Sequence, residues 1–228
     1  LVSTSRASGE RASALIPECV GQALAELPIA KRMRWGEGRA EFVRPVHWLV
    51  IIQGTTAIKC EILGVNAGVF TYGHRFLSEK PIRVSSADSY VSALQETGFV
   101  VADFAERREI VRQHAKRLGR KAGGQTIIED ELLNTVTGLV EWPHALLGTF
   151  DADFLKIPSE VLVSSMRDHQ KFFHLVDQSG NLLPKFIAIC NIKSRKMGRV
   201  REGNERVLHA RLSDAKFFWE EDCQNKLS

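Results

Sequence analysis

Positively charged side chains near aromatic rings are the residues of this sequence whose chemistry is the most specific. Residues 31–48 combine several cations with a histidine and two tryptophans around a turn. Cations can neutralise phosphates, and aromatic rings can stack on bases. Trp35 and Trp48 flank a predicted hairpin, so we expect them to anchor the core and leave the binding role to the arginines. The arginines of this run that we predict to contact nucleic acid are Arg32, Arg34 and Arg44.

Two later stretches also concentrate positive charge. Residues 107–121 contain Glu109 as their only acidic residue, and residues 185–211 contain only Glu202 and Glu205. Such clusters can bind phosphates, or they can be a solvated helix face and a solvated loop, and charge alone leaves both readings open. The first stretch comprises Arg107, Arg108, Arg112, Lys116, Arg117, Arg120 and Lys121. The predicted contacts of the second are Lys193, Arg195, Lys196, Arg199 and Arg206.

Two short motifs add histidine and aromatic groups. His74 and Arg75 follow a turn glycine and could form an anion site, although a turn histidine that bonds its own backbone fits equally well. His169 and Gln170 end a predicted helix, Phe172 follows it, and the three could hydrogen-bond and stack bases. The alternative for them is a helix-to-strand junction with His169 bonded to backbone.

Signals for other functions are weak. The sequence has no GxxxxGK[ST] or GxGxxG phosphate loop. His169 and His174 have no metal-ligand spacing, and the four cysteines form no CxxC pair, which predicts reduced thiols. Net charge is +4, and no apolar run is long enough to cross a membrane. The start shows no secretory pattern, and we expect an excised piece of a longer cytosolic protein.

Hydrophobic periodicity predicts the elements that position these residues. Helices are expected over 12–27, 88–96, 104–122, 129–140, 159–170 and 205–223, and strands over 41–53, 57–63, 82–84, 99–102, 145–150, 172–176 and 183–190. Residues 64–72 are expected to be a loop or bulged edge, and 193–203 a flexible basic loop in which Gly203 and Asn204 start the last helix. Hairpins without repeated βαβ units predict an α+β fold with a mixed or antiparallel sheet.

Six ordered runs make the sequence similar to a known family. They are KRMRWG (31–36), FVRPVHW (42–48), GHRFL (73–77), LVEWP (139–143), HQKFF (169–173), and GNERV (203–207) followed by ARLSDAKFF (210–218). Together they resemble the β subunit of bacterial heterotetrameric glycyl-tRNA synthetase, of which this chain would be an N-terminal-half fragment.

The resemblance implies a role without catalysis in this fragment. In that family the α subunit attaches glycine with ATP and Mg, and the β subunit binds and positions tRNA-Gly within an α2β2 assembly. The fold implied is the B3/B4-type module of the phenylalanyl-tRNA synthetase β chain, over 31–200, after a helical segment at 1–30 and before a helix at 201–228 that leads into the next domain. No cofactor is expected in the fragment itself. Two alternatives are a residual editing hydrolase of mischarged tRNA, using Glu141, His169 or Asn204, and a purely structural assembly module.

Overall fold

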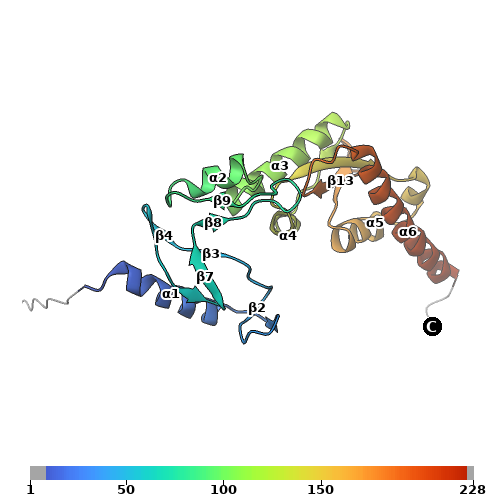
Figure 1. Ribbon diagram of the computed structural model, residues 1–228. Helices are drawn as coiled ribbons and strands as arrows, with labels where there is room; N and C mark the ends of the chain where they lie inside the picture. The colour runs from blue at the N-terminus through green and yellow to red at the C-terminus, as the bar shows by residue number, and fades with distance from the viewer. Residues whose placement is uncertain (1–8, 225–228) are drawn as a thin grey trace, which may run out of the picture. The chain divides into compact units, whose positions relative to one another are not determined.

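Short strands fill the first part of the chain, and long helices with one larger sheet fill the second (Figure 1). The computed structural model describes residues 9–224 and divides the chain into two compact units, Leu1–Gly98 and Phe99–Ser228. The expected α+β class is confirmed. The expected segments 1–30, 31–200 and 201–228 remain predictions about domain organisation. The division into compact units at residue 98 is a separate observation.

Within residues 9–98, the first unit contains two helices and several short sheets. Its sheets are β1–β2, β3–β7–β6, β4–β5 and β8–β9, and β3 runs parallel to β7. The elements are α1 (Ala12–Glu26), β1 (Met33–Arg34), β2 (Glu41–Phe42), β3 (Leu49–Val50), β4 (Ile52–Gln53), β5 (Thr56–Ala57), β6 (Glu61–Ile62), β7 (Val65–Gly68), β8 (Phe70–Thr71), β9 (Ile82–Arg83) and α2 (Tyr90–Glu96).

Turn chemistry explains part of this pattern. Gly54 has a φ of +59°, and it joins β4 to β5 in the tight hairpin that was expected at this position. The long strands expected on either side were wrong, because the ladder stops after two residue pairs. Residues 64–72, expected as a loop, contain β7 and β8 instead. The β6–β7 hairpin turns through Leu63 and Gly64, both at positive φ, and Leu63 carries no sequence signal for that conformation.

The core of the first unit is small. Its buried hydrophobic side chains among the described residues are Ile58, Ile82, Val84 and Leu94. The expectation that the two tryptophans anchor this core was wrong. Trp48 is 43% exposed, with its ring 4.8 Å from that of Tyr72, and Trp35 is only half-buried. Strands of two residues present too little apolar face to cover an indole on both sides.

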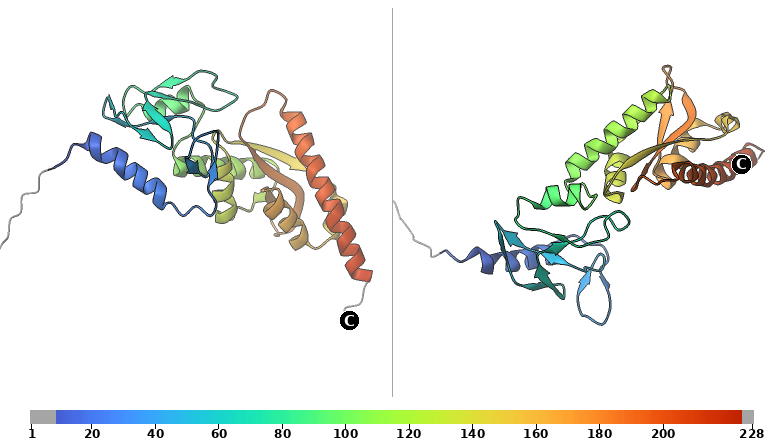
Figure 2. Two further views of the ribbon diagram at one scale, coloured as in Figure 1. Left: turned by 60° about the horizontal axis from the view of Figure 1, so that its bottom comes forward. Right: turned by 45° about the horizontal axis from the view of Figure 1, so that its top comes forward.

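The second unit places helices on both faces of a four-stranded antiparallel sheet (Figure 2). The strand order is β10–β12–β13–β11. The elements are α3 (Phe104–Lys121), β10 (Gln125–Thr126), α4 (Asp130–Leu139), β11 (His144–Thr149), the 3₁₀ turn η1 (Ala152–Lys156), α5 (Ser159–Ser164), the π-helical turn η2 (Ser165–His169), β12 (Phe173–Val176), β13 (Leu182–Cys190) and α6 (Met197–Gln224).

Strand β13 supplies both cores of this unit because side chains alternate along a strand. Phe186 and Ala188 pack with α5, η1 and α6, whereas Ile187 packs on the opposite face with α3 and α4. On β12, Phe173 and Leu175 join the α3–α4 side. Each fully buried side chain of this size contributes roughly 1.5–3 kcal/mol to folding.

Local signals set the ends of these helices. The Asp103 carboxylate accepts a hydrogen bond from the Glu106 amide at 2.7 Å, so it caps α3 as expected. Gly123, with a φ of +79°, ends that helix. The strand expected over 99–102 does not form, although the Val101 amide donates to the Glu141 carbonyl. The four cysteines are free thiols, and no helix within residues 9–224 has the length and apolar character to cross a membrane.

Candidate nucleic-acid interface

The start of α6 carries a concentration of positive charge. Lys193, Arg195 and Lys196 precede the helix and Arg199 lies in its first turn, and all four side chains are exposed. None of them forms an ion pair with a carboxylate in residues 9–224. The first turn contains no acidic residue. A helix N-terminus is itself positive, so these cations leave the charge at this end uncompensated.

The basic loop expected over 193–203 was only partly right. The chain is non-helical to residue 196, and α6 then begins at Met197. Gly203 and Asn204, expected to start the helix, lie inside it, and the Asn204 amide donates to the Val200 carbonyl at 2.8 Å. The residues Gly198 and Gly203 weaken the helical signal, but Leu208 and Leu212 bury completely and hold the helix against the sheet.

Glu205 fixes the position of the α6 start, a role that the sequence did not reveal. Its carboxylate accepts hydrogen bonds from the Thr149 amide at 2.9 Å and from the Thr149 hydroxyl at 3.0 Å. Thr149 ends the edge strand β11, so the basic end of α6 is tied to the sheet. The next residue, Arg206, pairs with Glu202 of the preceding turn at 3.2 Å. Both of these side chains are exposed, and such a pair contributes less than about 1 kcal/mol, so Arg206 can exchange partners.

The residues predicted near the end of α5 do not act together. Phe172 is 6% exposed and stacks on Phe186 with ring centroids 4.6 Å apart, so its predicted role in base stacking was wrong. The residue falls on the core face because η2 is a π-turn and Lys171 takes a positive φ of 58°, which shifts the helical register. His169 is exposed and Gln170 is half-buried, so both remain accessible.

Charge next to His169 is neutralised locally. The Arg167 guanidinium and the Ser164 hydroxyl both donate to Asp168, at 2.7 and 2.8 Å, and they lower the pKa of its carboxyl to about 2. Arg167 also pairs with Glu129 at 3.3 Å. Asp168 therefore orients Arg167 and bonds no histidine in the described residues, so Ser164, Asp168 and His169 do not form a hydrogen-bonded catalytic arrangement.

In the first unit, two of the three arginines that were predicted to contact nucleic acid donate hydrogen bonds to backbone carbonyls. Arg32 donates from Nη2 to the carbonyls of Leu24 and Ala25, at 3.2 and 2.8 Å, and so caps the end of α1. Arg44 is exposed, with Nη1 3.2 Å from the Val43 carbonyl. The third, Arg34, is exposed on β1, where it lies opposite Glu41 of β2.

His74 is buried and cannot bind a phosphate at the surface, contrary to the prediction. It is 2% exposed, its Nδ1 accepts from the Phe76 amide at 3.2 Å, and its Nε2 has no partner among the described residues. The His74 backbone amide donates to the Gly98 carbonyl at 2.7 Å. This close approach needs a glycine at position 73, because a Cβ there would lie 2.8 Å from the Gly98 carbonyl carbon. Arg75 is exposed and lies over the ring of Phe76, itself 73% exposed, at 5.9 Å.

Two histidines, one on α3 and one at the start of β11, contribute to the electrostatics of the second unit. Burial, followed by the positive neighbours His114 and Lys193, lowers the pKa of His144. Burial and Arg117 likewise lower the pKa of His114. The His144 Nε2 atom is buried and unpartnered in the described residues, so this side chain favours the neutral form.

The geometry gives no support to the editing alternative. The Glu141 backbone amide donates to the Asn191 side chain at 2.6 Å, and the Asn204 side chain bonds within its own helix. Among the described residues, no hydrogen bond or ion pair joins any two of Glu141, His169 and Asn204, and no cluster of His, Cys, Asp or Glu could hold a metal ion.

Comparison with known proteins agrees with the resemblance. The family model described as "Glycyl-tRNA synthetase beta subunit" matches residues 1–228. The glycine–tRNA ligase beta subunit of Hahella chejuensis is 46% identical over all 228 residues, which cover 33% of that relative. Those of Marinobacter nauticus and Chromohalobacter salexigens are 47% and 46% identical over 93% and 97% of this chain, and 31% and 32% of theirs.

The chain thus spans about a third of the length of the curated relatives it matches. The match runs through every motif considered above, from the first basic run to the last helix. The chain belongs to the glycyl-tRNA synthetase beta subunit family.

Proposed function

We propose that this chain contacts tRNA-Gly within glycyl-tRNA synthetase, and that the start of α6 is its main phosphate-binding surface. The observation that carries the proposal is the set of exposed, unpaired cations Lys193, Arg195, Lys196 and Arg199 at the positive end of a long helix. Like charges at that position destabilise a free protein slightly, and an anion bound there relieves the repulsion. The relatives are named as subunits of a glycine–tRNA ligase, so the anion that we propose is the phosphate backbone of tRNA.

The proposed division of labour follows the family. The chain positions tRNA and carries no chemistry of its own, while the α subunit attaches glycine with ATP and Mg in an α2β2 assembly in the cytoplasm. The first and second units together would correspond to a B3/B4-type module with flanking helices. Arg34, Arg44, Arg75, His169 and Gln170 remain secondary candidate contacts, because each is accessible.

The test is tRNA-Gly binding by the full-length β subunit assembled with its α subunit. Lys193→Gln with Lys196→Gln removes two unpaired charges from the α6 start. The matched control is Lys156→Gln with Lys216→Gln, which removes two lysines of the same unit that already pair with Asp153 and Glu220. The affinity of the first variant should fall on the order of tenfold near physiological salt, and the slope of log K against log salt should flatten by about 0.7–0.9 per lost phosphate contact.

The control should keep both the affinity and the slope of the unaltered enzyme. An equal loss in the two variants would show a general charge effect without a specific surface. An unchanged slope in the first variant would remove the α6 start from the interface.

A further inference from the structure

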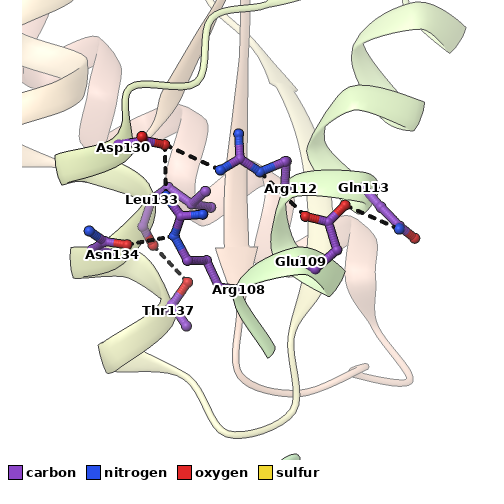
Figure 3. A network of polar contacts seen from close by, with 8 residues as sticks. All are labelled: Arg108, Glu109, Arg112, Gln113, Asp130, Leu133, Asn134 and Thr137. Atoms are coloured by element: carbon purple, nitrogen blue, oxygen red, sulfur yellow. Dashed lines mark hydrogen bonds and ion pairs between the residues drawn. The ribbon is translucent and has the colours of Figure 1, made fainter. Parts of the chain in front are cut away.

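The cations of α3 divide into two groups according to their partners. The group at the start of the helix is used internally. Arg108 and Arg112 both reach Asp130 of α4, at 2.7 and 3.2 Å, and Arg108 also donates to Asn134 (Figure 3). Arg107 donates to carbonyls that include that of Thr137, at 3.1 Å. These arginines hold α4 against α3, so they are not free for a ligand.

The group at the end of α3 has no such partners. Lys116, Arg117, Arg120 and Lys121 are exposed, and none of them forms an ion pair with a carboxylate in residues 9–224. Cations in the last turn of a helix are stabilised by its dipole, which accounts for Arg120 and Lys121. That effect falls off within one turn, so it does not account for Lys116. Lys116 and Arg120 are four residues apart and therefore share one face.

A groove runs beside that face. Its lining includes Lys116, Arg120, the backbone at Gly123 and Gly124, and the side of the β12–β13 turn at Asp177 and Gln178, and its volume is about 530 Å³. That size is within the range of sites for small ligands, which is room for a phosphate with its ribose. A Cβ at Gly123 would meet no atom within 4 Å, so the groove is open at this residue, whereas a Cβ at Gly124 would lie 2.9 Å from the Val176 carbonyl oxygen.

The one carboxylate in the lining is already satisfied within its own turn. Asp177 accepts hydrogen bonds from the Ser179 amide at 2.8 Å, and from the Asn181 amide and side chain at 2.9 and 3.0 Å. The lining therefore contains two cations that form no ion pair within residues 9–224, and one carboxylate whose hydrogen bonds are made within its own turn. The net charge of the lining is positive, which suits an anion such as a phosphodiester.

We propose that this groove, between the end of α3 and the β12–β13 turn, binds the sugar–phosphate backbone of tRNA as a second contact besides the α6 start. The inference rests on the proposed function, since it takes the same ligand. It assigns a ligand role to Lys116 and Arg120, and it leaves Arg107, Arg108 and Arg112 as structural.

The experiment compares four variants of the full-length β subunit with its α subunit, one of which is the α6 variant Lys193→Gln with Lys196→Gln described above. Lys116→Gln with Arg120→Gln should weaken tRNA-Gly binding roughly five- to tenfold and flatten the salt slope by about 1.4–1.8, the value for two phosphate contacts. Gln178→Lys adds a cation to the opposite wall, and it should tighten binding roughly two- to fivefold and steepen the slope. Lys156→Gln with Lys216→Gln is again the control of equal charge. The altered side chains are exposed except for Lys216, which is half-buried, so each variant should keep the hydrogen-exchange protection of the unaltered subunit in α3 and β10.

The outcomes separate this inference from the proposed function. If the α6 variant loses affinity while the α3 variant and Gln178→Lys keep the slope of the unaltered enzyme, the groove is not a contact and the proposed function stands. If neither the α6 variant nor the α3 variant changes binding, both proposals fail. A loss in the α3 variant equal to that of the control also overturns the groove. A loss in the α3 variant together with a gain in Gln178→Lys supports it.

Discussion

Replacing Gly119 with alanine should destabilise the second unit, although alanine favours a helix more than glycine does. Gly119 is buried in α3 where the helix crosses β10. A Cβ built there would overlap the Thr126 hydroxyl oxygen and would lie 3.1 Å from the Thr126 amide nitrogen. That hydroxyl is itself buried and donates to the Ala115 carbonyl at 3.0 Å. The new methyl group can be accommodated only if Thr126 moves and its hydrogen bond breaks.

The size of the effect follows from three contributions. Overpacking a close-packed site costs about 1–3 kcal/mol, and leaving a buried hydroxyl without a partner costs about 1–3 kcal/mol more. The gain in helix propensity offsets about 1 kcal/mol. The free energy of unfolding should therefore fall by about 3 kcal/mol, which corresponds to a drop of roughly 10 °C in the melting temperature of a unit of this size.

The assay is native-state hydrogen exchange of the full-length subunit, followed at the α3 and β10 amides, because a single melting transition is not defined for a protein with several domains. Gly138→Ala is the matched control. It lies near the end of α4, is exposed, and its added Cβ would meet nothing within 4 Å. This control should protect its helix by about 0.5–1 kcal/mol more than the unaltered chain.

Rescue by a second substitution sharpens the test. Thr126→Ala removes the atom that the new methyl group strikes, so Gly119→Ala should cost at least about 2 kcal/mol less in that background. The reasoning would be refuted if Gly119→Ala stabilised α3 as Gly138→Ala does, or if the two substitutions were additive.

Two further predictions concern the second unit. Glu205→Ala should lower the protection of the α6 amides against hydrogen exchange by about 1–3 kcal/mol, because it removes the charged acceptor of both Thr149 donors. The control Glu202→Ala breaks an exposed ion pair and should cost less than about 1 kcal/mol. His114, His144 and His174 have lowered pKa values in the folded chain, so the unfolded chain binds more protons at mildly acid pH. Their contribution to stability should be complete above about pH 7.5 and fall as the pH drops through about 6.5. The hydrogen-exchange protection of the second unit, measured from pH 8 to 5, should show this decline. A His144→Gln variant should show a smaller decline, and an unchanged one would contradict the contribution of His144.

The second unit could be predicted largely from sequence because its signals are long and consistent. Apolar residues at helical spacing over 129–140, a capping aspartate at Asp103 and an apolar hairpin around the turn at Gly180 all agree with the structure. The first unit could not be predicted in this way. Strands of two residues carry almost no periodicity, and the parallel pairing of Leu49 with Ala67 depends on contacts between distant segments.

The candidate site was predictable in its charges and not in its burial. Lys and Arg runs indicate exposed cations, and those at the α6 start are exposed as expected. His74 and Phe172 are of residue types that can bind bases, yet both are buried. The close approach of Gly73 to Gly98 directs His74 inward, and the π-turn η2 does the same for Phe172. Neither of these features leaves a mark in single-residue chemistry. Glu205, which ties α6 to the sheet, resembles any other helix carboxylate in the sequence.

The alternation along β13 has a consequence for how the second unit tolerates change in length. Phe186 and Ile187 are neighbours in sequence, but they belong to cores on opposite faces of the sheet. Losing or gaining one residue within the strand would turn both faces over at once and exchange the contents of the two cores. Because both cores depend on the register of this strand, we expect residues to be gained or lost in the β12–β13 hairpin at the exposed turn around Gly180 and not within β13.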